Sequence, residues 1–210
     1  MKVEVHADFA CAWCRLGLRR FERAVAAAGG EQPVELVHRP YQLSPDASEE
    51  PCSTVELMTR MIGSRDQVDA MFGEMTRLGA SEGVEYRFDR TVEVNTLTAH
   101  RLMWFAEQKY PAPVRSELAN AIYDAHFRDG VNIADRTQLV ALAERCGLDG
   151  DGVRRFLDSE EGVAEVTGQV AEARRSGITS VPTFVFENGE LLRGASTSEE
   201  ILAALRRAAQ

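Results

Sequence analysis

The chain has 210 residues against a typical ~150 per domain, so it can form one large domain or a smaller domain that carries an insertion. Its composition, 44% hydrophobic and 27% charged with seven prolines and sixteen glycines, excludes disordered, collagen-like and disulfide-stapled classes. The 33 acidic residues outnumber the 24 basic ones, and the resulting net charge of -9 repels a nucleic-acid backbone. We therefore expect no nucleic-acid partner.

The first residues of the chain, 1–8, lack the apolar core of a secretory signal because charged side chains appear within a few positions. No later run approaches the ~18 apolar residues that a membrane-spanning helix needs. These observations predict a cytoplasmic protein with no membrane partner. In that compartment thiols are kept reduced and structural disulfides are rare, so the four cysteines need another explanation.

Strand and helix patterns alternate in the N-terminal segment. Alternating apolar and polar residues predict a strand at about 2–8, and apolar residues at helical spacing predict a helix at about 12–28. Gly29-Gly30 supplies the C-terminal stop of this helix. A second strand is expected over 34–42, which completes a strand–helix–strand unit with a parallel strand pair.

Cys11 and Cys14 form a Cys-x-x-Cys motif directly between the first strand and the helix. Unpaired N–H groups and the positive dipole end at a helix start favour a thiolate, so we expect a lowered pKa for a partly exposed Cys11. Cys14 lies one turn on, is more covered and suits a resolving thiol. The motif predicts thiol–disulfide exchange, in which Cys11 forms a mixed disulfide with the substrate and Cys14 resolves it. Trp13, between them, is the expected exposed apolar contact with the substrate.

The other two cysteines have simpler interpretations. Cys146 lies on the apolar face of a predicted helix, which is typical of a small buried residue. Cys52 follows a proline in a polar stretch, where both an incidental residue and an exposed, oxidisable thiol fit. A zinc site would need two ligands beyond the Cys-x-x-Cys pair, and no second pair follows at ligand spacing. We predict neither a metal site nor a cofactor.

The C-terminal segment predicts a hairpin followed by a helix. A β-branched and aromatic run opens the hairpin, over 183–194, and Asn188-Gly189 is the dipeptide of a type I′ turn. Ser196 and Glu199 have the spacing of a capping box for a closing helix over 198–208. The hairpin extends the parallel strand pair into a mixed sheet.

Helical patterns run throughout the middle of the chain, from about 54 to 176. The predicted architecture is therefore α/β: a thioredoxin fold with a mixed β-sheet, interrupted by a large all-helical insertion. We assign 1–50 and 177–210 to the thioredoxin-fold domain and 51–176 to the insertion, which we expect to act as a lid.

Six short segments in chain order carry a family resemblance. They are Asp8-x-x-Cys11-Ala12-Trp13-Cys14, Asn95-Thr96-x-x-Ala99-His100-Arg101-Leu102, Ala125-His126-Phe127-x-Asp129-Gly130, Gly147-Leu148-Asp149, Val181-Pro182-Thr183-Phe184 and Gly194-Ala195. The chain resembles the DsbA-like thioredoxin oxidoreductases, and most closely their FrnE-like branch. The resemblance implies a redox dithiol at Cys11 and Cys14 that acts on thiol or disulfide substrates, either proteins or glutathione-like molecules.

The same resemblance implies that Pro182 is cis and packs against the thiols, with the backbone of Val181 offered to the substrate. From the residue alone a trans bond would be favoured, since only ~5–6% of such bonds are cis. Ala12 stands where the family usually has proline, so no redox potential can be borrowed from relatives and the direction of the reaction is left open.

Two alternative functions fit the same chain. Kappa-class glutathione transferases and 2-hydroxychromene-2-carboxylate isomerases share the inserted fold but have serine where this chain has Cys11, and they form no mixed disulfide. The two cysteines favour redox chemistry over these glutathione-dependent reactions. A non-catalytic thioredoxin-fold binding module is the other alternative, and in it Cys11 would have the ~8.5 pKa of a free thiol. A homodimer is compatible with the sequence.

Overall fold

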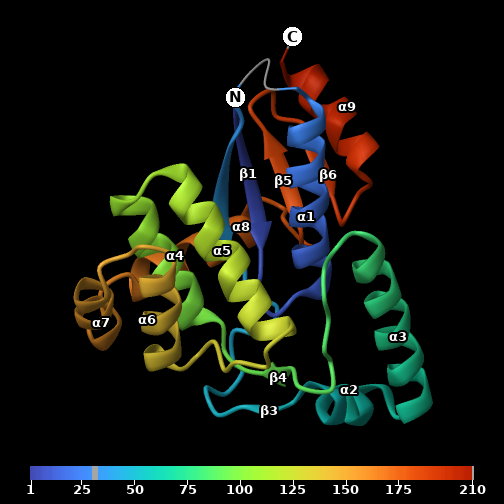
Figure 1. The fold of residues 1–210 in the computed structure, drawn as a ribbon, viewed down its shortest axis with the longest axis vertical. Helices are drawn as coiled ribbons and strands as arrows, with labels where there is room; N and C mark the ends of the chain where they lie inside the picture. Colours follow the sequence, from blue (N-terminus) through green and yellow to red (C-terminus); the bar gives the residue numbers. More distant parts are fainter. Residues whose placement is uncertain (30–32, 210) are drawn as a thin grey trace.

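The fold, taken from a computed structural model, is described for residues 1–29 and 33–209 (Figure 1). Its main sheet has the strand order β2-β1-β5-β6. The strands are β1 (Lys2–Ala7), β2 (Glu35–Pro40), β5 (Thr183–Phe186) and β6 (Leu191–Arg193). β1 pairs in parallel with β2 and antiparallel with β5, which pairs antiparallel with β6. The predicted thioredoxin fold with a mixed sheet is confirmed.

The helices cover the sheet and build the insertion. They are α1 (Ala12–Ala27), α2 (Thr54–Ile62), α3 (Arg65–Ser81), α4 (Leu97–Lys109), α5 (Ala112–Phe127), α6 (Arg136–Arg145), α7 (Gly150–Asp158), α8 (Val163–Arg175) and α9 (Ser198–Ala208). Figure 1 shows α1 and α9 side by side along the sheet, where they pack on one another. None of the helices in the described ranges is long and apolar enough to cross a bilayer.

One hydrophobic core joins the sheet to the insertion, because fully buried Val3 and Val5 of β1 belong to the same cluster as Leu102 of α4 and Leu118 of α5. The α2–α3 pair lies beside the start of α1 (Figure 1). α2 contacts both α3 and the β3–β4 ribbon, and Met75 of α3 joins the main core. The division of the chain into two domains stays a prediction.

The end of α1 agrees with its predicted stop. The helix ends at Ala27, and Gly29 follows with φ +75, a left-handed conformation that glycine adopts without steric cost. Gly30, the second residue of the predicted stop, lies outside the described residues.

The prediction that the insertion is helical throughout is wrong. A short ribbon pairs β3 (Cys52–Ser53) with β4 (Val92–Glu93), and the chain between α3 and α4 is extended or turned. In this segment Val84, Tyr86 and Phe88 are all buried. Their spacing of two residues is the period of an extended chain, not of a helix, and this explains the wrong prediction.

The predicted hairpin is confirmed, but its turn is not of type I′. That turn needs a positive φ at both central residues, and no described non-glycine residue has one. Asn188 instead accepts a hydrogen bond of 3.0 Å from Glu190 N through its side chain, and only Gly189 is left-handed. Gly189 N donates to Phe186 O at 2.9 Å, which closes the turn.

The capping box of α9 lies one residue later than predicted from Ser196 and Glu199. Thr197 is the N-cap; its hydroxyl accepts from Glu200 N at 3.2 Å, and the Glu200 carboxylate accepts from Thr197 N at 2.8 Å. Both residue pairs have the required spacing, and the helix start at Ser198 selects the second.

Candidate active site

Cys11 occupies the N-cap position of α1, with an extended backbone at φ -95 and ψ 109. The chain turns there directly after β1: Cys11 N donates to Asp8 O at 3.1 Å, and Cys14 N donates to Cys11 O at 3.0 Å. Phe9 anchors the turn in the core, with its ring centroid 5.0 Å from that of His100 and 4.8 Å from that of Tyr123. The strand end and the helix start thus hold the first cysteine at a fixed place.

The two thiols of the motif differ in acidity. Both are free, and Cys14 is fully buried. The Cys14 thiol, which hydrogen-bonds the Cys11 sulfur, is the largest cause of the lowered pKa of Cys11, and the backbone N–H groups of Cys14 and Trp13 also lower it. Burial is the largest cause that raises the pKa of Cys14 well above its usual value. The arrangement suits one ionisable nucleophile beside one thiol that keeps its proton.

The lowered pKa of Cys11 agrees with the sequence-based expectation, but its exposure does not. We expected a partly exposed sulfur, and the residue is only 7% exposed. Trp13 is the exposed residue of the motif, at 50%. The difference arises because segments far along the chain close over the cysteine.

The segment before β5 is one of these. The Val181–Pro182 peptide is cis, which confirms the expectation drawn from the resemblance, and Cys11 Sγ lies 4.0 Å from Val181 O. Pro182 packs against α1 at Gly17, where an added Cβ would lie 2.8 Å from Pro182 Cγ. Sequence reasoning missed Gly17, although a glycine inside a helix, at a cost of ~0.5–1 kcal/mol relative to alanine, is itself a signal of close approach.

Asp8 lies fully buried beneath the motif. Its Oδ2 accepts a 2.6 Å hydrogen bond from Leu43 N, and its Oδ1 lies 3.4 Å from His100 Nε2. Burial opposes ionisation of this carboxyl, but hydrogen bonds from His100, Leu43 N and Thr96 outweigh it and hold the pKa of Asp8 below its usual value. His100 Nε2 also lies 3.1 Å from Tyr41 O, so this histidine has hydrogen-bond partners in the core.

Two tyrosines of the insertion hold the backbone of the motif. Tyr123 donates to Asp8 O at 3.1 Å, and Tyr86 donates to Ala12 O at 2.6 Å. Neither residue was singled out from the sequence, because the contacts join positions 115 and 74 residues apart.

A second carboxyl lies near that of Asp8. Glu93 of β4 has its pKa raised to about 7, chiefly by burial and then by the charge of Asp8. In the β3–β4 ribbon it stands opposite Cys52, which is exposed. Exposure fits both interpretations of Cys52, an incidental residue and an oxidisable thiol.

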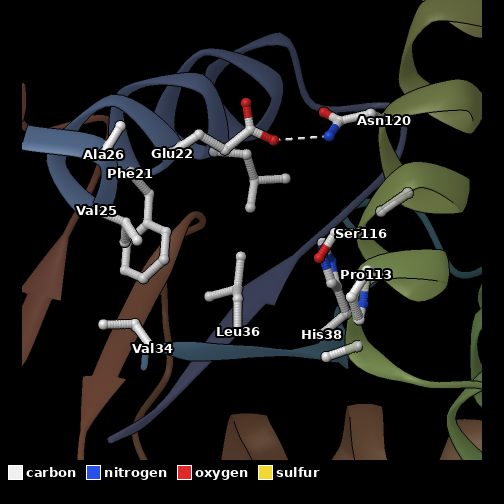
Figure 2. Close-up of a pocket in the computed structure, with 13 residues that line it drawn as sticks. Phe21, Glu22, Val25, Ala26, Val34, Leu36, His38, Pro113, Ser116 and Asn120 are labelled. Atoms are coloured by element: carbon white, nitrogen blue, oxygen red, sulfur yellow. Dashed lines mark hydrogen bonds between the residues drawn. The ribbon is translucent and has the colours of Figure 1, made fainter. Parts of the chain in front are cut away.

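Other candidate features lie apart from the thiols. Across residues 1–29 and 33–209, no group of three or more His, Cys, Asp or Glu side chains is arranged to hold a metal ion. A hollow of about 380 Å³ opens between α1, β2 and α5 (Figure 2). Phe21, Val25 and Leu36 give it apolar walls, and Glu22 accepts a hydrogen bond from Asn120 across its rim. Its described lining includes no residue of the motif.

The sequence matches the family described as DSBA-like thioredoxin domain over residues 2–206. The chain therefore belongs to this family, and the finer assignment to a FrnE-like branch stays a prediction.

Solved structures share the fold. A probable DsbA oxidoreductase from Streptomyces coelicolor is 32% identical, with a TM-score of 0.91 over 99% of this chain and 89% of that one. A 2-hydroxychromene-2-carboxylate isomerase has a TM-score of 0.75 at 16% identity, over 100% of this chain and 96% of that one. The cytosolic disulfide reductase DsbM from Pseudomonas aeruginosa has a TM-score of 0.67 at 18% identity, over 99% and 98%.

Proposed function

We propose that this protein is a thiol–disulfide oxidoreductase in which Cys11 is the attacking thiol and Cys14 the resolving thiol. The observation that carries the proposal is the placement of the two thiols within one turn of α1, with Cys11 at the N-cap and Cys14 fully buried. The pKa of Cys11 is lowered and that of Cys14 is raised, which agrees with this placement. An exchange reaction needs one thiolate to attack a disulfide and a second thiol to attack the mixed disulfide that forms. Similarity to a probable DsbA oxidoreductase supports the same chemistry.

In the reducing direction, the Cys11 thiolate attacks a substrate disulfide, and one substrate sulfur leaves as a thiolate that takes up a proton. The Cys14 thiol then loses its proton and attacks the Cys11 sulfur, which releases the second substrate thiol. The protein ends as the Cys11–Cys14 disulfide, oxidised by two electrons, and the substrate is reduced by two. The oxidising direction is the reverse, and the redox potential of the pair decides between them.

The substrate would bind over Trp13, Val181 and Pro182. Half-exposed Trp13 offers an apolar surface beside the thiols. The Val181 carbonyl, 4.0 Å from Cys11 Sγ, offers a backbone group to an extended chain, either a protein or a glutathione-like molecule. DsbM, with the same fold, has also been solved with GSH and is described as cytosolic, which supports small thiols as substrates and a cytoplasmic location.

The insertion, residues 51–176, would act as a lid on this site. Support comes from Tyr86, His100 and Tyr123, which all belong to the insertion and hydrogen-bond the motif or Asp8 beneath it.

A glutathione-dependent isomerase is the second candidate, because a 2-hydroxychromene-2-carboxylate isomerase has the same fold. Such an enzyme activates the thiol of glutathione and needs no covalent bond to its own chain. Two cysteines of opposite acidity are unnecessary for that reaction, so the geometry favours exchange.

Trapping of a covalent intermediate separates the candidates. Cys14→Ala removes the resolving thiol, so after incubation with a disulfide substrate we expect a mixed disulfide at Cys11, detected by mass spectrometry and released by reductant. Cys146→Ala is the matched control and should give no additional adduct. Isomerase turnover without any adduct would favour the second candidate, and a binding module would give neither.

A further inference from the structure

Tyr86 reaches the Cys-x-x-Cys motif from the extended segment between α3 and α4. It is 2% exposed, and its hydroxyl donates a 2.6 Å hydrogen bond to Ala12 O. Ala12 is the first residue of α1, and its carbonyl belongs to the same peptide unit as Trp13 N–H. The hydroxyl therefore binds one end of a peptide whose N–H belongs to the second residue of α1, a position from which a helix start can donate to its N-cap side chain, here Cys11.

This peptide is placed to influence the thiolate. After the Cys14 thiol, which is the largest cause, the N–H groups of Cys14 and Trp13 lower the pKa of Cys11 because they bond best to the ionised sulfur. A hydrogen bond received at the carbonyl end of a peptide polarises it and strengthens donation from the N–H end, since linked hydrogen bonds are cooperative.

The ring of Tyr86 is held by contacts that do not involve its hydroxyl. It stacks with Phe88 at 5.3 Å between centroids and meets Phe127 edge-on at 5.4 Å. An added Cβ on Gly79 of α3 would overlap the ring, so glycine at that position makes room for it. Replacing tyrosine by phenylalanine therefore removes the hydrogen bond and keeps the packing.

From this geometry we infer that Tyr86 is a positioning residue of the thiol site: its hydroxyl orients and polarises the Ala12–Trp13 peptide so that Trp13 N–H supports a thiolate at Cys11. This inference rests on the proposed function, in which Cys11 is the attacking thiol. Hydrogen bonding that stabilises the Cys11 thiolate also stabilises the reduced protein, and it therefore makes the Cys11–Cys14 disulfide a stronger oxidant.

Other charges face the same region and are already paired. Arg15 and Arg20 of α1 act on the Tyr86 hydroxyl, but Arg15 pairs with Asp124 at 2.8 Å and Arg20 with Glu82 at 2.9 Å. The charge of Asp8 beneath the motif opposes ionisation of Cys11. Because these groups stay in place when only the hydroxyl is removed, its effect can be measured separately.

The first test is Tyr86→Phe in the full chain. Cooperative strengthening is modest, ~10–30% per bond, so we expect the ionisation constant of Cys11, from the pH profile of its alkylation, to fall about two- to threefold. The equilibrium with glutathione should move about two- to threefold toward the Cys11–Cys14 disulfide, which is about 10–15 mV more negative at ~30 mV per tenfold. Tyr110→Phe, which removes only a 2.9 Å bond from Asp149 N, should change neither quantity.

A second test should shift the ionisation constant of Cys11 in the opposite direction. Ring fluorination makes a phenol more acidic and a better donor, so 3-fluorotyrosine at position 86 should raise the ionisation constant of Cys11. Burial raises the pKa of Tyr86 above its usual value, so the fluorinated hydroxyl stays protonated. This replacement keeps both the ring and the hydroxyl, so it remains informative if the phenylalanine variant does not fold.

The two experiments have decisive outcomes. If folded Tyr86→Phe and the fluorinated protein both have the same alkylation profile as the wild-type protein, the inference is overturned, because the hydroxyl then has only a structural role. If the wild-type protein forms no Cys11–Cys14 disulfide with glutathione, the proposed function fails. The alkylation profiles would still decide whether Tyr86 tunes Cys11.

Discussion

Cys11 and Cys146 are equally exposed to solvent, at 7% each, yet the pKa values of their thiols are shifted in opposite directions. Cys11 caps the start of α1, and its pKa is lowered, first by the Cys14 thiol and then by backbone N–H groups. Cys146 caps the end of α6, and its pKa is raised, first by burial and then by the charge of Glu117. Two cysteines with the same cover thus have different chemistry.

The difference shows that cover alone does not decide whether a thiol ionises. A helix start presents unpaired N–H groups, which stabilise a thiolate, whereas a helix end presents unpaired carbonyl oxygens, which do not. Cys14, inside the first turn and fully buried, has its pKa raised like that of Cys146. The position at the helix start and the neighbouring S–H together separate Cys11 from both.

The largest expected effect is on turnover. Cys11→Ser should reduce the turnover of a disulfide substrate such as insulin to background, because a hydroxyl cannot form a mixed disulfide. Cys146→Ser should leave turnover largely intact, since this thiol lies at the C-terminal end of α6 and not in the Cys-x-x-Cys motif. Insulin reduction followed by turbidity measures both. Full activity in both variants would show that the site is assigned wrongly.

Alkylation compares the two thiols within one protein. At pH 7 iodoacetamide should modify Cys11 at least ~10 times faster than Cys146, because only the thiolate reacts and their cover is the same. The ratio should shrink as the pH rises, since Cys146 then ionises as well. Mass spectrometry of the two peptides gives both rates. Equal alkylation rates at pH 7 would contradict the conclusion that the start of α1 favours a thiolate and the end of α6 does not.

Charge removal sharpens the comparison further. Asp8 raises the pKa of Cys11 and Glu117 raises that of Cys146, so Asp8→Asn and Glu117→Gln are matched changes. Each should increase the ionisation constant of its own thiol a few-fold and leave the other unchanged, as read from alkylation against pH. Slower alkylation of Cys11 in Asp8→Asn would mean that the carboxylate acts through its hydrogen bonds more than through its charge.

The smallest expected effect is on stability against pH, because one group contributes only ~1.4 kcal/mol per unit of pKa shift. The raised pKa of Cys146 means that its contribution to the stability of the reduced protein is fully present below the unfolded value of ~8.5 and is lost as the pH rises from there through the higher folded pKa. The lowered pKa of Cys11 has the opposite sign: its contribution is gained as the pH rises through the folded pKa and is complete above the unfolded one.

Urea unfolding under reductant at pH 7 and pH 9.5 checks these signs. Relative to wild type, Cys146→Ala should gain stability on going to the higher pH, and Cys11→Ala should lose it. Shifts of the same sign in the two variants would contradict the comparison.

Much of the outer fold could be predicted because its signals are local. The predicted first strand ends one residue beyond β1, and the predicted last helix has the bounds of α9. The extended run through Tyr86 could not be recognised as readily, because its alternation is short and lies between strong helical patterns. Gly17 left a weaker trace, a glycine inside a helix, whose meaning depends on the position of Pro182.

From the sequence by itself followed the order of the elements outside the insertion, the location of Cys11 at a helix start and the place of Cys14 one turn later. These properties depend on residue spacing along a few turns of chain, which backbone geometry converts into local structure. Only the tertiary structure decided what surrounds the sulfurs: Val181 O arrives from 170 residues away and the Tyr86 hydroxyl from 74. Periodicity shows which face of an element is buried, but the packing of distant segments selects which groups meet there.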